Sequence, residues 1–164
     1  MREPKAGRTP DGDIVLHHLP PLLRDVILQL PALIADDAPG VEDRLFPDAY
    51  GGEGMESEEW RRLAVPELRH LFASARALVT SDLAGLTRER NLAPSWRLTI
   101  PGPHLQAWLS SLAAARVALG GAHDLDAAAM DRPLPVRIAD RKDRAVILIH
   151  MLGWIQGMLV EAAG

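Results

Sequence analysis

The chain has 164 residues, no cysteine, 4% aromatic residues and a formal net charge of −4. The length fits one domain, and the missing cysteines exclude disulfides, thiolate metal sites and cysteine nucleophiles, as expected of a cytoplasmic protein. The scarcity of aromatic residues favours an aliphatic, mainly helical core, and the acidic balance argues against a protein that neutralises many phosphates.

The first part of the chain predicts a tail, a strand and a helix. Residues 1–12 are polar and lack the apolar core of a signal peptide, so we expect a flexible arm ahead of a single helical domain over residues 13–164. The segment DIVLHHL, residues 13–19, begins with β-branched residues and predicts a weak strand. The helix expected next carries an apolar stripe from Leu22 to Ile34, within which Pro31 should introduce a kink or a break.

Residues 36–56 form a long predicted loop. Loops of this length in compact domains are usually functional or disordered. Ser57 is the predicted N-cap of the following helix, whose first turn carries Glu58 and Glu59. Pro66 is expected to end that helix and to start a second, longer one.

A second strand is predicted by SWRLTI, residues 95–100, in which apolar and polar side chains alternate. We expect it to pair with residues 13–18 in a two-stranded ribbon that lies on the helices, because an isolated ribbon is only marginally stable. A helix over residues 103–119 opens with proline and closes with glycine. The predicted fold class is therefore mainly α, a compact bundle of about five helices with a small β-ribbon.

Residues 145–160 are apolar around nearly the whole circumference of the last predicted helix. This length spans only roughly 24 Å, less than the roughly 30 Å hydrocarbon core of a membrane, and would leave His150 in lipid, so we expect no membrane span. A helix that is apolar on two faces is usually enclosed by its own domain, and His150 would then be a hydrogen-bonded core residue. Gly153, Trp154 and Gly157 are expected to allow a close contact with a neighbouring helix of the same chain or, alternatively, with a second copy of the chain in a homodimer.

Arg116 follows Leu109 and Leu112 on the expected inner stripe of its helix. Because burying an unpaired charge is costly, we expect a carboxylate or several carbonyls around this guanidinium. If the long loop folds back, Asp48 pairs with Arg116 or with Arg44. Candidate partners are Asp48, Glu59 and Glu67. The network either only fastens the loop or lines a ligand or partner groove. The candidate residues are Arg44, Phe46, Asp48, Tyr50, Glu59, Trp60 and Arg116.

Motifs of known chemistry are missing from the sequence. It contains no nucleotide-binding, phosphate-binding, zinc-protease or serine-hydrolase pattern, and its histidines lack metal-ligand spacing. We therefore expect a non-enzymatic protein without catalytic residues, cofactor or metal.

Four motifs occur in an order that resembles a known actinobacterial family, domain of unknown function 2017, over residues 13–163. They are RLFPDAY, EEWRRL, AWLSSLAAARVALG and MLGWIQGMLVEA. The resemblance implies a cytoplasmic, mainly helical, non-enzymatic protein, and some members are described as transcriptional or oxidative-stress regulators. The family pattern falls on Arg44, Pro47, Tyr50, Trp108, Arg116, Gly120, Gly153, Trp154 and Glu161. None of these positions carries a catalytic role.

Three functions stay open from the sequence. The first is a regulatory or protein-interaction protein that acts through a protein partner or as a homodimer. The second is a DNA-binding transcriptional regulator, which would need a basic face. The candidate arginines are Arg61, Arg62, Arg69, Arg76 and Arg97. The third is a small-ligand-binding protein with a pocket at the loop around residues 44–50.

Overall fold

The computed structural model describes residues 2–164 of the chain. The strands are β1 (Lys5–Arg8), β2 (Ile14–Leu19), β3 (Thr87–Arg88) and β4 (Trp96–Ile100). The helices are α1 (Pro21–Leu33), α2 (Val41–Leu45), α3 (Met55–Leu83), α4 (Leu105–Ala122), α5 (Ala127–Asp131) and α6 (Arg141–Ala163). The fold is mainly α with a small sheet, which confirms the predicted class.

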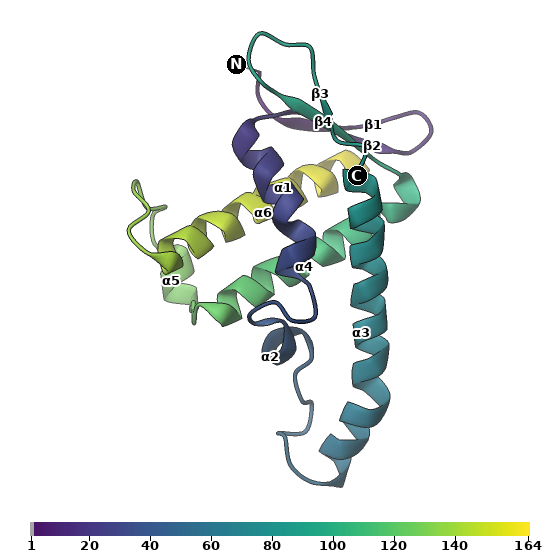
Figure 1. Ribbon diagram of the computed structural model, residues 1–164, viewed down its shortest axis with the longest axis vertical. Helices are drawn as coiled ribbons and strands as arrows, with labels where there is room; N and C mark the ends of the chain where they lie inside the picture. The colour runs from purple at the N-terminus through teal and green to yellow at the C-terminus, as the bar shows by residue number, and fades with distance from the viewer. Residues whose placement is uncertain (1) are drawn as a thin grey trace.

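The helical body is built on α4 and α6, which lie side by side and make the most extensive contact between any two elements. Helix α1 crosses both of them, and α3 runs along one side of the body and projects beyond it (Figure 1). Trp108 of α4 is the largest fully buried side chain, and the remainder of the core is aliphatic. The scarcity of aromatic residues therefore shows directly in the packing.

The sheet is four-stranded and antiparallel, in the order β1-β2-β4-β3, and lies at one end of the helices (Figure 1). The predicted pairing of β2 with β4 is confirmed, with Val15 opposite Thr99, but the sheet has two strands more than predicted. The expectation of a flexible arm over residues 1–12 is wrong for residues 5–8. They form β1 because the TPDG turn at residues 9–12 returns the chain to pair with β2.

Prolines interrupt neither long helix. Helix α1 includes Pro31, so a break there is wrong, while a kink at Pro31 stays a prediction. Helix α3 runs for 29 residues through Pro66, so the predicted end and restart at Pro66 are wrong. Pro66 and residue 62, whose carbonyl loses its helical donor, are both exposed, so water can replace the missing hydrogen bond. Ser57 lies inside the helix rather than at its N-cap, which is Gly54.

Helix α6 is long and apolar enough to cross a membrane by length and composition alone, a property it shares with core helices, and 39% of its most apolar window is buried. One face packs against the body through residues such as Leu152, Ile155 and Leu159. The other face is open: His150 is exposed and Trp154 is 48% exposed. Full enclosure of this helix and a core position for His150 are therefore wrong, because no element within residues 2–164 covers the face that carries His150 and Trp154.

Candidate functional site

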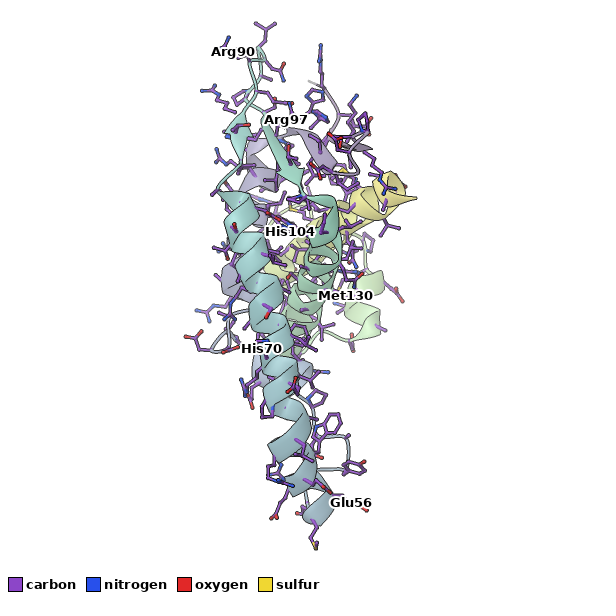
Figure 2. The ribbon with its side chains drawn as sticks, turned by 90° about the vertical axis from the view of Figure 1, so that its right-hand side faces the viewer. Glu56, His70, Arg90, Arg97, His104 and Met130 are labelled. Carbon is purple, nitrogen blue, oxygen red and sulfur yellow. The ribbon has the colours of Figure 1, made fainter. Side chains whose placement is uncertain are left out.

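The predicted loop over residues 36–56 is wrong in part, because α2 and the first residues of α3 lie within it. Its remaining C-terminal part and the start of α3 form a projection that we call the arm, residues 47–64. Figure 1 shows it extending past α2, and Figure 2 places Glu56 at the far end of the long axis. The base of the arm is fixed by Phe46, which is 7% exposed and packs edge-to-face on Phe72 with ring centroids 5.8 Å apart. The Arg69 guanidinium lies 4.4 Å from the centroid of the Phe46 ring. Phe46 therefore anchors the loop and does not line a groove.

Asp48 holds the arm in its folded shape. Its Oδ1 atom accepts a hydrogen bond from the Tyr50 backbone N–H at 2.8 Å and another from the Ser57 hydroxyl at 3.0 Å. Its Oδ2 atom accepts one from Arg61 Nε at 3.3 Å, and Arg61 also donates to the Gly52 carbonyl at 2.8 Å. The partner of Asp48 is thus Arg61, and the predicted pairing with Arg116 or Arg44 is wrong.

These contacts also fix the electrostatic state of the loop. The hydrogen bond from the Tyr50 N–H holds the pKa of Asp48 below its ordinary value of 3.8, with help from Ser57 and Arg61, although burial acts in the opposite direction. A carboxylate that accepts several donors stays ionised at lower pH, because each donor stabilises the charged form. Asp48 is therefore a fixed negative centre that organises the turn.

A small pocket of about 190 Å³ lies on the outer side of the arm. We call it the arm pocket. It is lined by Tyr50, Glu56, Glu59, Trp60, Leu63 and Ala64. The residues at 56, 59, 60 and 63 follow the spacing of a single helix face. The Tyr50 and Trp60 rings are 6.4 Å apart at 74°, and Trp60 Nε1 donates to the Pro47 carbonyl at 3.0 Å, which fixes the indole on the loop.

The arm pocket combines two aromatic rings with two carboxylates. Aromatic faces attract cations through the ring quadrupole, and carboxylates add charge and hydrogen-bond acceptors. Glu59 lies 4.0 Å from Arg62, too far for a strong ion pair, and both side chains are mostly exposed. This combination suits a cationic side chain. The predicted residues Tyr50, Glu59 and Trp60 do meet at one place, and Glu56 joins them.

Arg116 does not belong to this site. It is exposed, and its Nη1 atom donates to Gln156 of α6 at 3.0 Å. The buried row of α4 passes through Trp108, Leu112 and Ala115, one residue before Arg116 and so about 100° away around the helix. The expectation of a buried, carboxylate-paired Arg116 is therefore wrong, since neither Asp48, Glu59 nor Glu67 reaches it.

Other predicted residues lie elsewhere. Arg44 is exposed at the end of α2, with its aliphatic stem so close to Gly121 that a side chain there would collide with it. The Arg116 guanidinium lies over Gly153, where an added Cβ would be 3.4 Å from Cζ. Gly157 and Trp154 face outward on α6. A homodimer contact through these residues stays a prediction.

The proposed basic face is largely neutralised. Arg61 pairs with Asp48, Arg69 with Glu42, and Arg76 lies 3.6 Å from Asp36. Arg97 is exposed on β4. Paired cations offer less free charge to phosphates, whereas Arg62 lies 4.0 Å from Glu59 and is mostly exposed. DNA binding through these arginines stays a prediction.

Two polar clusters could not be seen from the sequence. Asp82 accepts hydrogen bonds from His104 and Trp108 between α3 and α4, and Glu89 accepts from His18 across 71 residues of chain. No local spacing links such distant residues, so only the tertiary fold identifies them. Within residues 2–164, no group of three His, Asp or Glu side chains is arranged to hold a metal ion.

Comparison with known proteins places the chain in a family without placing it in a function. Neither the curated proteins nor the solved structures give a match to the chain. The family model described as Domain of unknown function (DUF2017) matches residues 8–163, which is nearly the full length. The chain therefore belongs to the DUF2017 family.

Proposed function

We propose that this protein is a non-enzymatic cytoplasmic regulator that binds a protein partner by taking one of its lysine or arginine side chains into the arm pocket. The observation that carries the proposal is the pairing of Tyr50 and Trp60 with Glu56 and Glu59 at the end of a projecting helix. A cation over an aromatic face gains about 0.5–2 kcal/mol, depending on how far it is desolvated.

The charge around the arm pocket supports a basic partner. The arm, residues 47–64, contains five acidic side chains and two arginines, one of which, Arg61, is paired with Asp48. Most of these acids are exposed, so they attract a positively charged surface before contact and disfavour an acidic one. The arm thus concentrates negative charge where the protein extends furthest into solvent.

Exposed apolar side chains near the arm pocket supply the remainder of an interface. Tyr50 is 55% exposed, Met55 85% and Leu63 53%. Large apolar side chains on a projecting element are typical of contact surfaces, and flexible methionines adapt to partners of different shape. Burial of these side chains by a partner would complement the capture of its cation.

A regulatory role agrees with the resemblance to a family in which some members are described as transcriptional or oxidative-stress regulators. Without cysteines, this chain cannot sense oxidation through a thiol. We infer that it acts by binding alone.

A homodimer is the second candidate, and it would use a different surface. Trp154 and Val160 of α6 are 48% and 54% exposed, and Val117 of α4 is also 48% exposed. An apolar face of this kind on two adjacent helices is a common basis for self-association.

The arm pocket can be tested with a defined probe. We expect N-acetyl-arginine methylamide to shift the Trp60 indole resonances saturably in an NMR titration, and the neutral N-acetyl-norleucine methylamide to shift them far less. The double variant Glu56→Gln/Glu59→Gln should weaken the arginine probe several-fold. Glu58→Gln is the matched control, because Glu58 is exposed in the same turn but does not line the arm pocket.

The same variants test partner binding. Proteins captured by the wild-type chain should be lost with Glu56→Gln/Glu59→Gln and kept with Glu58→Gln, and the capture should weaken with salt. The proposal is wrong if the arginine probe gives no saturable shift up to roughly 50 mM, a binding free energy of about −1.8 kcal/mol, or if Glu58→Gln has the same effect as the double variant.

A further inference from the structure

A cavity of about 400 Å³ lies at the opposite end of the molecule, between the N-terminal residues and the loop that joins β3 to β4. We call it the arginine cavity. Its polar lining comes from Arg2, His18, Arg90, Asn91 and Ser95, and its apolar walls from Pro20 and residues 92–94. Figure 2 shows Arg90 at the end of the long axis far from Glu56. The arginine cavity is therefore separate from the arm.

The arginine cavity is positively charged in an acidic protein. Arg2 and Arg90 line it, and no acidic residue belongs to its lining. Within residues 2–164, neither guanidinium lies within 4.0 Å of a carboxylate, whereas Arg24, Arg61 and Arg69 each have such a partner. Two arginines without a carboxylate partner that line one cavity are suited to an anion, because each guanidinium can present paired N–H donors.

Glu89 holds the polar lining in place. Its Oε2 atom accepts hydrogen bonds from His18 Nδ1 at 2.9 Å, from the Ser95 hydroxyl at 2.8 Å and from Asn91 Nδ2 at 3.3 Å. Burial raises the pKa of Glu89, but the hydrogen bonds from Ser95 and His18 outweigh it and leave the pKa below the ordinary value of 4.5. The ionised carboxylate of Glu89 thus orients the side chains of His18, Asn91 and Ser95, which donate hydrogen bonds to it.

The backbone of His18 carries strain that this arrangement explains. His18 has φ of 59°, in the left-handed region, where the pairing of β2 with β4 shifts between Leu16 and Leu19. A non-glycine residue there costs free energy, and such residues concentrate at functional sites. Glu89 fixes the conformation, because it accepts from both the backbone N–H of His18, at 3.1 Å, and its ring.

The hydrogen bond between His18 and Glu89 also determines which ring nitrogen of His18 is available to a ligand. A carboxylate can only accept, so Nδ1 of His18 carries the proton that it shares with Glu89. Nε2 is then the remaining polar atom of the ring, an acceptor when the imidazole is neutral and a donor when it is protonated. The strained position therefore supplies an oriented imidazole to the same cavity that Arg2 and Arg90 line.

We propose that the arginine cavity binds a small organic anion, a phosphate monoester or a carboxylate that carries an apolar group. Arg2 and Arg90 contact the charged end, Nε2 of His18 hydrogen-bonds to it, and the walls formed by Pro20 and residues 92–94 take the apolar part. The volume lies near the lower end of the range for small-molecule sites. This inference does not depend on the function proposed for the arm.

Isothermal titration of the full chain with phenyl phosphate, benzoate and benzyl alcohol tests the proposal. The three probes share a ring and differ in charge. We expect at least one anion to bind at a single site and to shift the His18 imidazole resonances in NMR spectra. Arg90→Gln should weaken that binding by about tenfold or more, since it removes a charge-assisted contact. Arg97→Gln is the matched control, an exposed arginine of β4 outside the cavity.

Each outcome has a defined meaning. Tighter binding of phenyl phosphate assigns the site to phosphate monoesters, and tighter binding of benzoate assigns it to carboxylates. The proposal is overturned if neither anion binds saturably, if benzyl alcohol binds as tightly as the anions, or if Arg97→Gln weakens binding as much as Arg90→Gln. Both arginines are exposed, so both variants are expected to fold, which circular dichroism would verify.

Discussion

Replacing Asp82 by alanine should destabilise the protein through a single buried indole. The Asp82 side chain is 6% exposed and accepts hydrogen bonds from His104 Nδ1 at 2.9 Å and from Trp108 Nε1 at 2.9 Å. Trp108 is fully buried, whereas the His104 side chain is 27% exposed. Without the carboxylate, water can reach the imidazole but not the indole N–H.

The size of the stability loss in Asp82→Ala depends on whether each donor, Trp108 or His104, can find another hydrogen-bond acceptor. A buried donor left unsatisfied costs about 1–3 kcal/mol, and the charge-assisted bond to His104 adds about 1 kcal/mol after water replaces part of it. Asp82 stands in the last turn of α3, where a negative charge is unfavourable by about 0.5 kcal/mol and its removal offsets part of the loss. The net expectation for Asp82→Ala is a loss of about 1.5–3.5 kcal/mol.

Urea unfolding of a double-mutant cycle measures this effect. Trp108→Phe removes the donor, so Asp82→Ala should cost less in that background, with a coupling energy of about 1–3 kcal/mol. The melting temperature of Asp82→Ala should fall by about 3–14 °C for a chain of this length. A loss below about 0.5 kcal/mol, or additive single variants, would show that the indole finds another acceptor and would refute the reasoning.

Three further predictions concern α2, the arm and α6. Gly40→Ala should lower the free energy of unfolding in urea by roughly 2–5 kcal/mol, because Gly40 has φ of 79° and a Cβ there would collide with a backbone carbonyl of α4. Gly52→Ala is the control: Gly52 has φ of 89° but lies in open space, so the loss should be only about 1 kcal/mol. Equal losses for the two variants would contradict the collision at Gly40. The hydrogen bond from the Tyr50 N–H is the main cause that lowers the pKa of Asp48 in the folded protein below its ordinary value of 3.8. The ionised Asp48 therefore contributes its full stabilisation of the fold above pH 3.8, and this contribution is lost as the pH falls through the lower, folded-state pKa. Asp48→Asn should remove this pH dependence of unfolding, and an unchanged profile would exclude the role given to Asp48. Trp154→Ser should change the free energy of unfolding by no more than about 0.5 kcal/mol relative to the wild type, because Trp154 is half-exposed. If the chain dimerises through α6, analytical sedimentation should show that the variant is shifted to monomer. A wild-type protein that is monomeric at every concentration would rule out that contact.

Local patterns were sufficient for the elements that depend on them. Strands β2 and β4 show alternation or β-branched residues, and α4 and α6 show long apolar segments, so their existence follows from the chain itself. The turn before β2 also carries a recognisable TPDG signal. This turn signal is typical of a hairpin and so favours a strand at residues 5–8. The polar composition of residues 1–12 favours a flexible arm instead, which is why the strand was not predicted.

Some residues of the candidate site could also be predicted from local sequence patterns, whereas their pairing partners could not. Tyr50, Glu59 and Trp60 stood out because rings and acids are concentrated in one short segment, and neighbours on one helix face must lie close together. Several arginines could pair with Asp48, and the fold brings Arg61 to it rather than Arg44 or Arg116. One residue of helix rotation separates the buried Ala115 from the exposed Arg116, a difference too small for an apolar stripe to resolve.

The sequence by itself determined the mainly helical class, the aliphatic core, the missing thiol chemistry and the acidic, aromatic character of the arm, because these follow from composition and short-range spacing. Only the tertiary structure decided which face of α6 is open, that Arg116 lies in solvent, and that Glu89 holds His18 beside two free arginines. The physical reason is that burial and pairing between residues far apart in the chain depend on how the helices cross, and many carboxylates compete for each cation until the fold brings one of them within hydrogen-bonding distance.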